Sequence, residues 1–148
     1  MLKNLSPVLG PELLYTLRAM GHGDEIAIVD GNYPADNAGP ANVIRADGHN
    51  SVRMLDAILS VLPLDDAVPE AAFRPSVPGK VAHLEPVMED LARVIAKHEP
   101  SIKLTALEPA AFYERVRKAY AVVGTSERRL YGNVILRKGV IRPGEGPD

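Results

Sequence analysis

The 148-residue sequence contains no cysteine. The chain therefore cannot form disulfides, thiolate zinc sites or iron–sulfur clusters, and it has no thiol nucleophile. A chain of this length buries roughly two-thirds of its unfolded surface, so a core can form without covalent cross-links. We expect a single domain over residues 1–148, and the lack of cysteine is compatible with a cytoplasmic protein.

Long apolar runs and basic blocks are also missing. No run approaches the roughly 18 residues of a membrane span. The first residues, MLKNLSPVLG, have no long apolar stretch and no small-residue cleavage site, so we expect mature protein and not a signal peptide. The 17 basic and 19 acidic residues nearly balance, and the densest basic cluster is Glu-Arg-Arg at 127–129. We therefore predict a soluble cytoplasmic protein that binds neither nucleic acid nor membrane.

Strand-like and helix-like segments alternate along the chain. Four consecutive apolar residues at 26–29 indicate a strand covered on both faces, as in parallel sheets. The alternation predicts an α/β fold, a three-layer α/β/α sandwich with a mixed, mostly parallel sheet. We expect helices over residues 11–20, 51–62 (with Asn50 or Ser51 as the cap), 85–99 and 109–120, and strands over 25–30, 43–45, 80–84, 102–107, 121–125 and 133–141.

Three segments lack a regular pattern. Residues 31–40 have the composition of a loop, and four prolines in residues 63–79 argue against regular helix there. The tail, residues 142–148, is expected to fray.

The first chemical candidate is His22, which stands between two glycines in AMGHGDEIAIVD, residues 19–30. Near neutral pH an imidazole can both donate and accept a proton, as general acid–base catalysis requires. The flanking glycines allow a tight turn and leave the ring accessible. The alternative is an exposed histidine in a loop that ends a helix.

Asp30 ends the buried strand. In open α/β sheets, ligands bind beyond the carboxyl ends of strands, and a carboxylate there can orient a sugar hydroxyl or a histidine. The alternative is an Asx-turn or a cap for the next segment.

The third candidate is Tyr-Gly-Asn at 131–133. Tyr131 offers a hydroxyl and a flat apolar face, and Asn133 offers both donors and acceptors, which suits a sugar. The alternative is a plain turn before the last strand. The other histidines lack the spacing of metal ligands, and no Gly-x-Ser-x-Gly elbow is present, so we predict neither a metal site nor a serine nucleophile.

Four blocks, in order, resemble the D-ribose pyranase and L-fucose mutarotase family: LGPELLYTLRAMGHGDEIAIVD, VIRADG, AFYERVRKAYAVV and YGNVILRKGVI. The resemblance runs from residue 1 to about residue 141, and MGHGDEI and YGN are its most specific motifs. The ribose branch tends to have alanine where Gly132 stands, so the chain is more similar to the L-fucose mutarotase branch.

The resemblance implies that the protein interconverts the anomers of a free reducing sugar, with L-fucose as the expected substrate and without cofactor or metal. It implies a three-layer α/β sandwich and a homo-oligomer, often a decamer, with active sites at subunit interfaces. By position, His22 matches the proton donor, and the residues that match sugar contacts are Asp30, Tyr131, Gly132 and Asn133.

The chemistry suits these groups. Opening the sugar ring requires that the ring oxygen gain a proton while the anomeric hydroxyl loses one. We hypothesise that protonated His22 donates to the ring oxygen and that Tyr131, or a water held by Asp30, accepts the anomeric proton.

The chain departs from the family pattern at two places. Related mutarotases usually have Ala-His where this chain has Gly31 and Asn32, and a basic residue usually stands where this chain has Pro109. Glu108 is one candidate replacement for that basic contact. A D-ribose pyranase and a non-catalytic sugar-binding or regulatory protein stay open as alternative functions.

Overall fold

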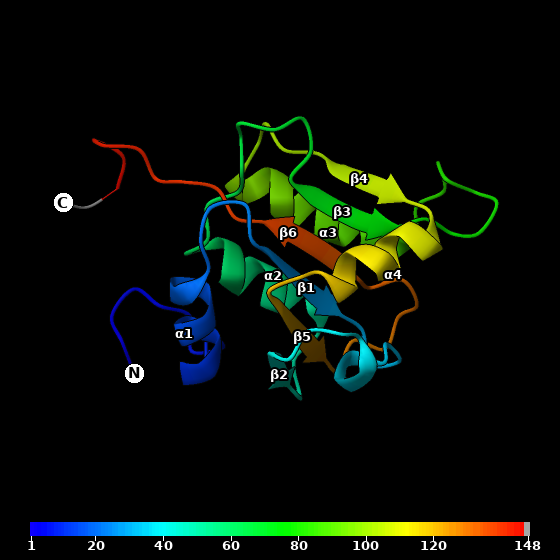
Figure 1. Cartoon of the computed structure of the whole chain (residues 1–148), viewed down its shortest axis with the longest axis horizontal. Coiled ribbons are helices and arrows are strands. Elements are labelled where there is room, and N and C mark those ends of the chain that lie inside the picture. The colour runs from blue at the N-terminus through cyan, green and yellow to red at the C-terminus, as the bar shows by residue number, and fades with distance from the viewer. Residues whose placement is uncertain (147–148) are drawn as a thin grey trace.

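A six-stranded sheet in the order β2-β5-β1-β6-β3-β4 forms the middle of the computed structural model, which describes residues 1–146 (Figure 1). The neighbours β1 and β5, β2 and β5, and β3 and β4 are parallel, whereas β6 runs antiparallel to both β1 and β3. The predicted mixed, mostly parallel sheet is therefore confirmed. The strands are β1 (Glu25–Val29), β2 (Val43–Ala46), β3 (Ala72–Pro75), β4 (Leu104–Leu107), β5 (Ala121–Thr125) and β6 (Val134–Arg137).

Helices cover both faces of this sheet. The larger core cluster joins one face to α1, α2 and α3, and the smaller cluster joins the other face to α4 and a short 3₁₀ turn, η1. This arrangement confirms the expected α/β class and its three layers. The helical elements are α1 (Pro11–Ala19), η1 (Ala35–Asn37), α2 (Ser51–Leu59), α3 (Pro86–His98) and α4 (Pro109–Arg117).

Strand β1 lies at the centre of the core. Its residues Ile26, Ala27, Ile28 and Val29 are completely buried. Because side chains alternate along a strand, the two isoleucines pack in the larger cluster and Ala27 and Val29 pack in the smaller one. The sequence-based prediction of a strand covered on both faces is confirmed.

Local signals explain where the helices begin. A proline occupies the first turn of α1, α3 and α4, where its missing N–H is not needed. At α2 the Asn50 side chain caps the helix by accepting from the backbone N–H of Arg53 at 2.8 Å.

The prediction of a strand at residues 80–84 is wrong. Those residues are exposed, and Val77 and Lys80 form a turn. The strand of this region is β3, inside the proline-bearing segment 63–79, which indeed contains no helix. Its proline is tolerated because Pro75 is the last strand residue and lies beyond the register that pairs Phe73 with Ile135 of β6.

Other boundaries are shorter than expected. Strand β6 ends at Arg137 instead of continuing to residue 141, and η1 adds one turn of helix to the loop at 31–40. Residues 142–146 form a turn region, and the last two residues of the tail that we expected to fray, 147 and 148, lie outside the described residues. Among the helices of residues 1–146, none has the length and apolar character needed to cross a bilayer.

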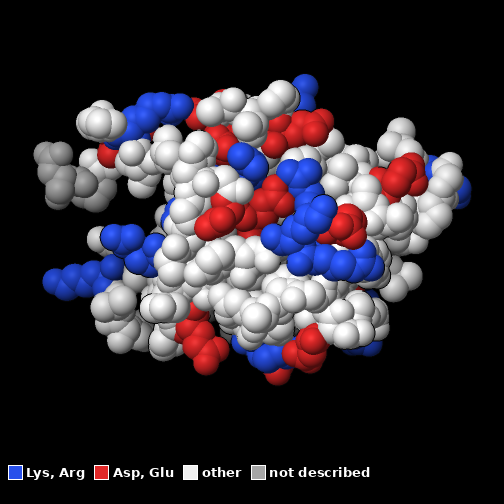
Figure 2. Space-filling view, viewed as in Figure 1, with Lys and Arg blue, Asp and Glu red and all other residues white. Residues whose placement is uncertain are grey.

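Charges of both signs lie side by side on the face that carries α4 (Figure 2). Arg115 of α4 donates to Glu25 at the start of β1 through both Nε and Nη2, at 2.6–3.0 Å. The same guanidinium carbon lies 3.7 Å from the ring centroid of Phe73. This ion pair and cation–π contact fasten α4 to the sheet.

We predict that Phe112→Ala lowers the free energy of unfolding by about 3–5 kcal/mol, because the ring is completely buried and its loss leaves a cavity. Tyr15→Ala is the matched control, since that ring is 76% exposed, and its effect should stay within about 0.5 kcal/mol. Urea unfolding followed by circular dichroism at one protein concentration measures both. Equal losses in the two variants would contradict the assignment of Phe112 to the core.

Candidate active site

One cluster of polar groups lies at the carboxyl end of β1. Because β6 is antiparallel to β1, the residue before β6 lies beside the residue after β1. Asn133 Nδ2 donates to Asp30 Oδ2 at 2.9 Å, and the Asp30 backbone N–H donates to Asn133 Oδ1 at 2.7 Å. Both residues are buried. Two of the predicted sugar contacts are thus brought together.

The Asp30 carboxylate has a second partner. Its Oδ1 accepts from the backbone N–H of Asn32 at 2.9 Å, which is the Asx-turn considered as the alternative for this residue. Asp30 therefore both shapes its own loop and fixes the Asn133 amide. The carboxylate is held in one orientation beyond the end of the strand.

Tyr131 and Gly132 complete this end of the sheet. Tyr131 is half-buried against the larger core cluster and has a φ of 65°, which is rare for residues other than glycine. A Cβ on Gly132 would lie 2.6 Å from Glu127 Cγ and 3.2 Å from Ser51 Oγ. The backbone here is consequently too crowded for any side chain at 132 unless Glu127 moves.

Glu127 is a buried residue that the sequence reasoning did not select. Its carboxylate accepts hydrogen bonds from Arg129 and Ser51, and its carbonyl accepts the N–H of Gly31 at 2.9 Å. The hydrogen bonds from Arg129 lower the pKa of Glu127 from 4.5 to about 2. In the sequence this residue was visible only as part of the charge cluster at 127–129.

His22 lies at the opposite end of the sheet, in the turn between α1 and β1. Its Nε2 is 3.0 Å from Asp65 Oδ2, and its side chain is 51% exposed. The Asp65 side chain is buried, and Oδ2 also accepts from Arg137 Nε at 2.9 Å. The Arg137 hydrogen bond is the main cause that holds the pKa of Asp65 below its usual value. The ionised carboxylate therefore orients the imidazole.

The backbone around Asp65 is closely packed. A Cβ on Gly139 would overlap the carbonyl of Leu64 and lie 2.8 Å from the Asp65 nitrogen. The Asp65 N–H donates to the carbonyl of Arg137 at 3.1 Å. The backbone of Arg137 and Gly139 thus packs against Asp65 and fixes its position, and Asp65 in turn positions His22.

Sequence reasoning missed Asp65 and Arg137. Neither belongs to a motif that spacing alone marks, and they are 72 residues apart. The one available signal was that a histidine used as an acid needs a carboxylate partner, which spacing could not identify.

The two clusters are separated within one chain. The five residues of β1 alone span about 13 Å, and the turn with His22 and the Asp30–Asn133 pair lie beyond its opposite ends (Figure 1). A single chain therefore places the His22–Asp65 pair and the Asp30–Asn133 pair at opposite ends of the central strand β1.

Gly31 and Pro109, two of the three residues that depart from the family pattern, have structural roles. The N–H of Gly31 donates to Glu127, and a Cβ there would lie 3.3 Å from the same oxygen, so the site is tight. Pro109 is the first residue of α4, and Glu108 stands at its cap position without a side-chain cap bond.

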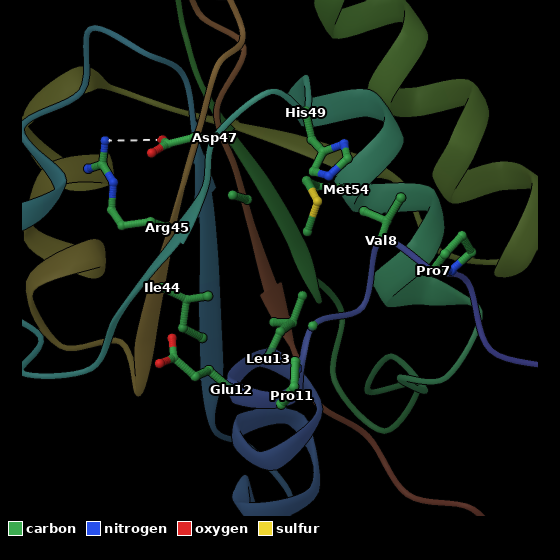
Figure 3. A pocket seen from close by; sticks show the side chains of 12 residues that line it. Pro7, Val8, Pro11, Glu12, Leu13, Ile44, Arg45, Asp47, His49 and Met54 are labelled. Carbon is green, nitrogen blue, oxygen red and sulfur yellow. Dashed lines mark hydrogen bonds and ion pairs between the residues drawn. The ribbon is translucent and has the colours of Figure 1, made fainter. Parts of the chain in front are cut away.

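A cavity of about 500 Å³ lies elsewhere, between α1, the edge strand β2 and the start of α2 (Figure 3). Arg45 and Asp47 stand on one side of it and His49 and Met54 on the other. Its lining includes none of the predicted site residues. Within residues 1–146, no three His, Asp or Glu side chains converge on a point that a metal ion can occupy.

The fold and these groups define a class: an open α/β sheet protein with an imidazole–carboxylate pair at one sheet end and buried amide and carboxylate groups at the other. Residues 3–141 match the model of the RbsD / FucU transport protein family, and the chain belongs to this family.

Its relatives cover nearly the whole chain. The sequence is 42% identical to the fucose mutarotase of Danio rerio, over 97% of each chain. A fucose mutarotase from Streptococcus pneumoniae, solved in complex with L-fucose, has a TM-score of 0.84 and 38% identity over 95% of this chain and 100% of that one. FucU from Bifidobacterium longum has a TM-score of 0.87 and 40% identity over the same shares. The family resemblance seen in the sequence is confirmed.

We predict that Asp65→Asn lowers the free energy of unfolding at pH 7 by about 1.5–3 kcal/mol, because a buried hydrogen bond between charged groups is lost. The pKa of Asp65 is lower in the folded state than in the unfolded state. Its contribution is therefore fully present above the unfolded pKa and disappears as the pH falls through the folded pKa. The acid-induced loss of stability should be shallower in the variant than in the wild type.

Asp66→Asn is the matched control for that measurement. Asp66 also pairs with an arginine, Arg142, but both side chains are about half exposed, so solvent screens the pair. Little change in stability is expected. Equal effects of the two substitutions in urea unfolding between pH 3 and pH 7 would argue against a special role of Asp65.

Proposed function

We propose that this protein is a mutarotase, an isomerase that interconverts the anomers of L-fucose. The family and the relatives named fucose mutarotase support the substrate and the reaction. The observation that carries the chemistry is the His22–Asp65 pair, because it supplies a half-exposed imidazole held by an ionised carboxylate.

His22 is the proposed acid. Its Nε2 faces Asp65, so Nδ1 is the nitrogen left for the sugar. Protonated His22 donates its Nδ1 proton to the ring oxygen while the anomeric hydroxyl loses its proton, and the bond between the anomeric carbon and the ring oxygen breaks. Rotation of the resulting aldehyde and reclosure, with the proton returned to His22, give the other anomer. Asp65 keeps the ring oriented, as a carboxylate does beside a catalytic histidine.

The sugar is held by the groups at the other sheet end. Asp30 and Asn133 would bind its hydroxyls, and the backbone at Gly132 would approach it closely. Tyr131, or a water held by Asp30, would accept the anomeric proton. These assignments are supported by the mutual hydrogen bonds of Asp30 and Asn133, which fix both groups beyond β1.

A complete site then requires a second copy of the chain. Since β1 separates the two clusters, His22 of one subunit must meet Asp30 and Asn133 of a neighbour. Such a contact is head-to-tail and closes into a ring when the rotation allows it. We therefore propose a homo-oligomer with interfacial sites. The decamer and the cytoplasmic location stay predictions.

We predict that His22→Ala slows anomer exchange of L-fucose by about 100-fold or more, since general acid–base catalysis is typically worth that factor. Saturation-transfer NMR on fucose, ribose, galactose and glucose measures the rates and names the preferred sugar. His83→Ala is the control, because His83 is also half exposed and lies 3.0 Å from a carboxylate, that of Glu85. An unchanged rate in His22→Ala would refute the role of His22. Enhanced exchange of ribose alone would favour a pyranase, and binding without any enhancement would favour a sugar-binding protein.

We also predict that two inactive variants complement each other. When His22→Ala and Asn133→Ala are co-expressed, mixed assemblies should contain some interfaces where His22 and Asn133 are both intact. Random mixing in equal amounts would restore about a quarter of the sites, because each site takes one residue from each of two neighbours. The exchange rate of the purified mixture is compared with that of each variant alone. No recovery in a mixture shown by mass spectrometry to be hetero-oligomeric would contradict the shared site.

A further inference from the structure

The segment that presents the sugar-binding groups has an unfavourable backbone conformation. Tyr131 has a φ of 65°, in the left-handed region that residues with side chains rarely adopt. Such a conformation persists only where the surrounding structure holds it. Contacts from neighbouring residues must therefore stabilise the segment that runs from Arg129 to Asn133.

Glu127 contacts this segment and the Asp30 loop at once. Its Cγ occupies the space where a Cβ of residue 132 would stand, so its side chain packs directly against the backbone of Gly132. Its carbonyl accepts the N–H of Gly31 at 2.9 Å, next to Asp30. Glu127 consequently lies between the two strand ends whose side chains, Asp30 and Asn133, pair with each other.

Arg129 holds Glu127 in a single orientation. Oε1 accepts from the backbone N–H of Arg129 at 3.0 Å and from its Nε at 2.9 Å, and Oε2 accepts from its Nη2 at 2.9 Å. A fork of this kind is geometrically specific as well as strong.

The pair is also fastened to the helical layer. Arg129 Nη1 lies 2.7 Å from Asp90 Oδ2 on α3, and Ser51 Oγ at the start of α2 donates to Glu127 Oε2 at 3.3 Å. Two helices thus fix the position of a pair that neither contains.

We propose that Glu127 and Arg129 are positioning residues whose ion pair fixes the segment carrying Tyr131 and Asn133 and thereby sets the affinity for the sugar. This inference rests on the proposed function, in which that segment contacts the substrate. While the Glu127–Arg129 ion pair is formed, only glycine fits at position 132. The hydrogen bonds of the pair to other side chains run to Ser51 and Asp90, away from His22 and Asp65, so the pair leaves the proposed acid in place and acts through the segment that binds the sugar.

The kinetic test compares Arg129→Ala with the wild type in NMR anomer exchange. We expect KM for L-fucose to rise about tenfold and kcat to fall by a smaller factor, because the contacts of this segment with the sugar hydroxyls are made in the ground state as well as in the transition state. Glu127→Gln, which keeps the shape and removes the charge, should change KM in the same direction. An unchanged KM in Arg129→Ala, or a fall in kcat at unchanged KM, would overturn the proposal.

Arg93→Ala is the matched control. Arg93 pairs with the same Asp90 but does not reach Glu127, and its side chain is 74% exposed. Its KM and kcat should equal those of the wild type. A rise in KM equal to that of Arg129→Ala would assign the effect to the surface charge of α3 and so overturn the proposal.

A second test does not depend on activity. Gly132→Ala is introduced into the wild type and into Arg129→Ala, and the thermal midpoints are measured. With Arg129 removed, Glu127 is free to turn away from the new methyl group, so the midpoint should fall roughly half as far as in the wild type, or less. Equal falls of the thermal midpoint in both backgrounds would overturn the proposal that the Glu127–Arg129 pair fixes this segment. If the wild type accelerates anomer exchange of no sugar, the proposed function fails. The coupling between Gly132→Ala and Arg129→Ala in the thermal midpoint then tests the positioning role of the ion pair by itself.

Discussion

The antiparallel pairing of β6 with β1 is the constraint on which both ends of the site depend. Strand β1 is preceded by His22 and followed by Asp30. Strand β6 is preceded by Asn133 and followed closely by Gly139, whose backbone packs against Asp65. The register that pairs Ile28 with Val134 lets Asn133 reach Asp30 at one end. At the other end the same register carries Arg137 to Asp65. A slip of one residue would reverse every side chain of β6 between the two faces and would separate both sets of partners.

Both ends of the sheet use an ionised carboxylate buried beside an arginine. Asp65 pairs with Arg137, and Glu127 pairs with Arg129. Burying such charges costs desolvation energy, and removing one partner is more costly still because a buried charge is left alone. Breaking either pair is therefore costly, and each pair fixes the geometry around it. One orients the imidazole, and the other shapes the loop that holds the buried amide of Asn133.

Sequence patterns predicted most of the fold where residues repeat with a clear period. The apolar run of β1, the amphipathic α3 and the prolines that begin three helices all correspond to elements of the structure. The pattern failed in the proline-bearing region, where it indicated a strand at residues 80–84 and missed β3. Strand β3 has only four residues and ends in Pro75, so it depends on its pairing with β6 and β4 and not on local propensity.

Motifs of a few neighbouring residues were readable without any structure, because local chemistry depends on local spacing. His22 between its glycines, Asp30 at a strand end and the Tyr-Gly-Asn turn were identified in this way, as was the family. The partners of those residues were not. Asp65 reaches His22 across 43 residues, and Asn133 reaches Asp30 across 103. Which side chains meet follows from strand order and direction, and these are set by long-range pairing and by the burial of both sheet faces, which no short stretch of sequence encodes.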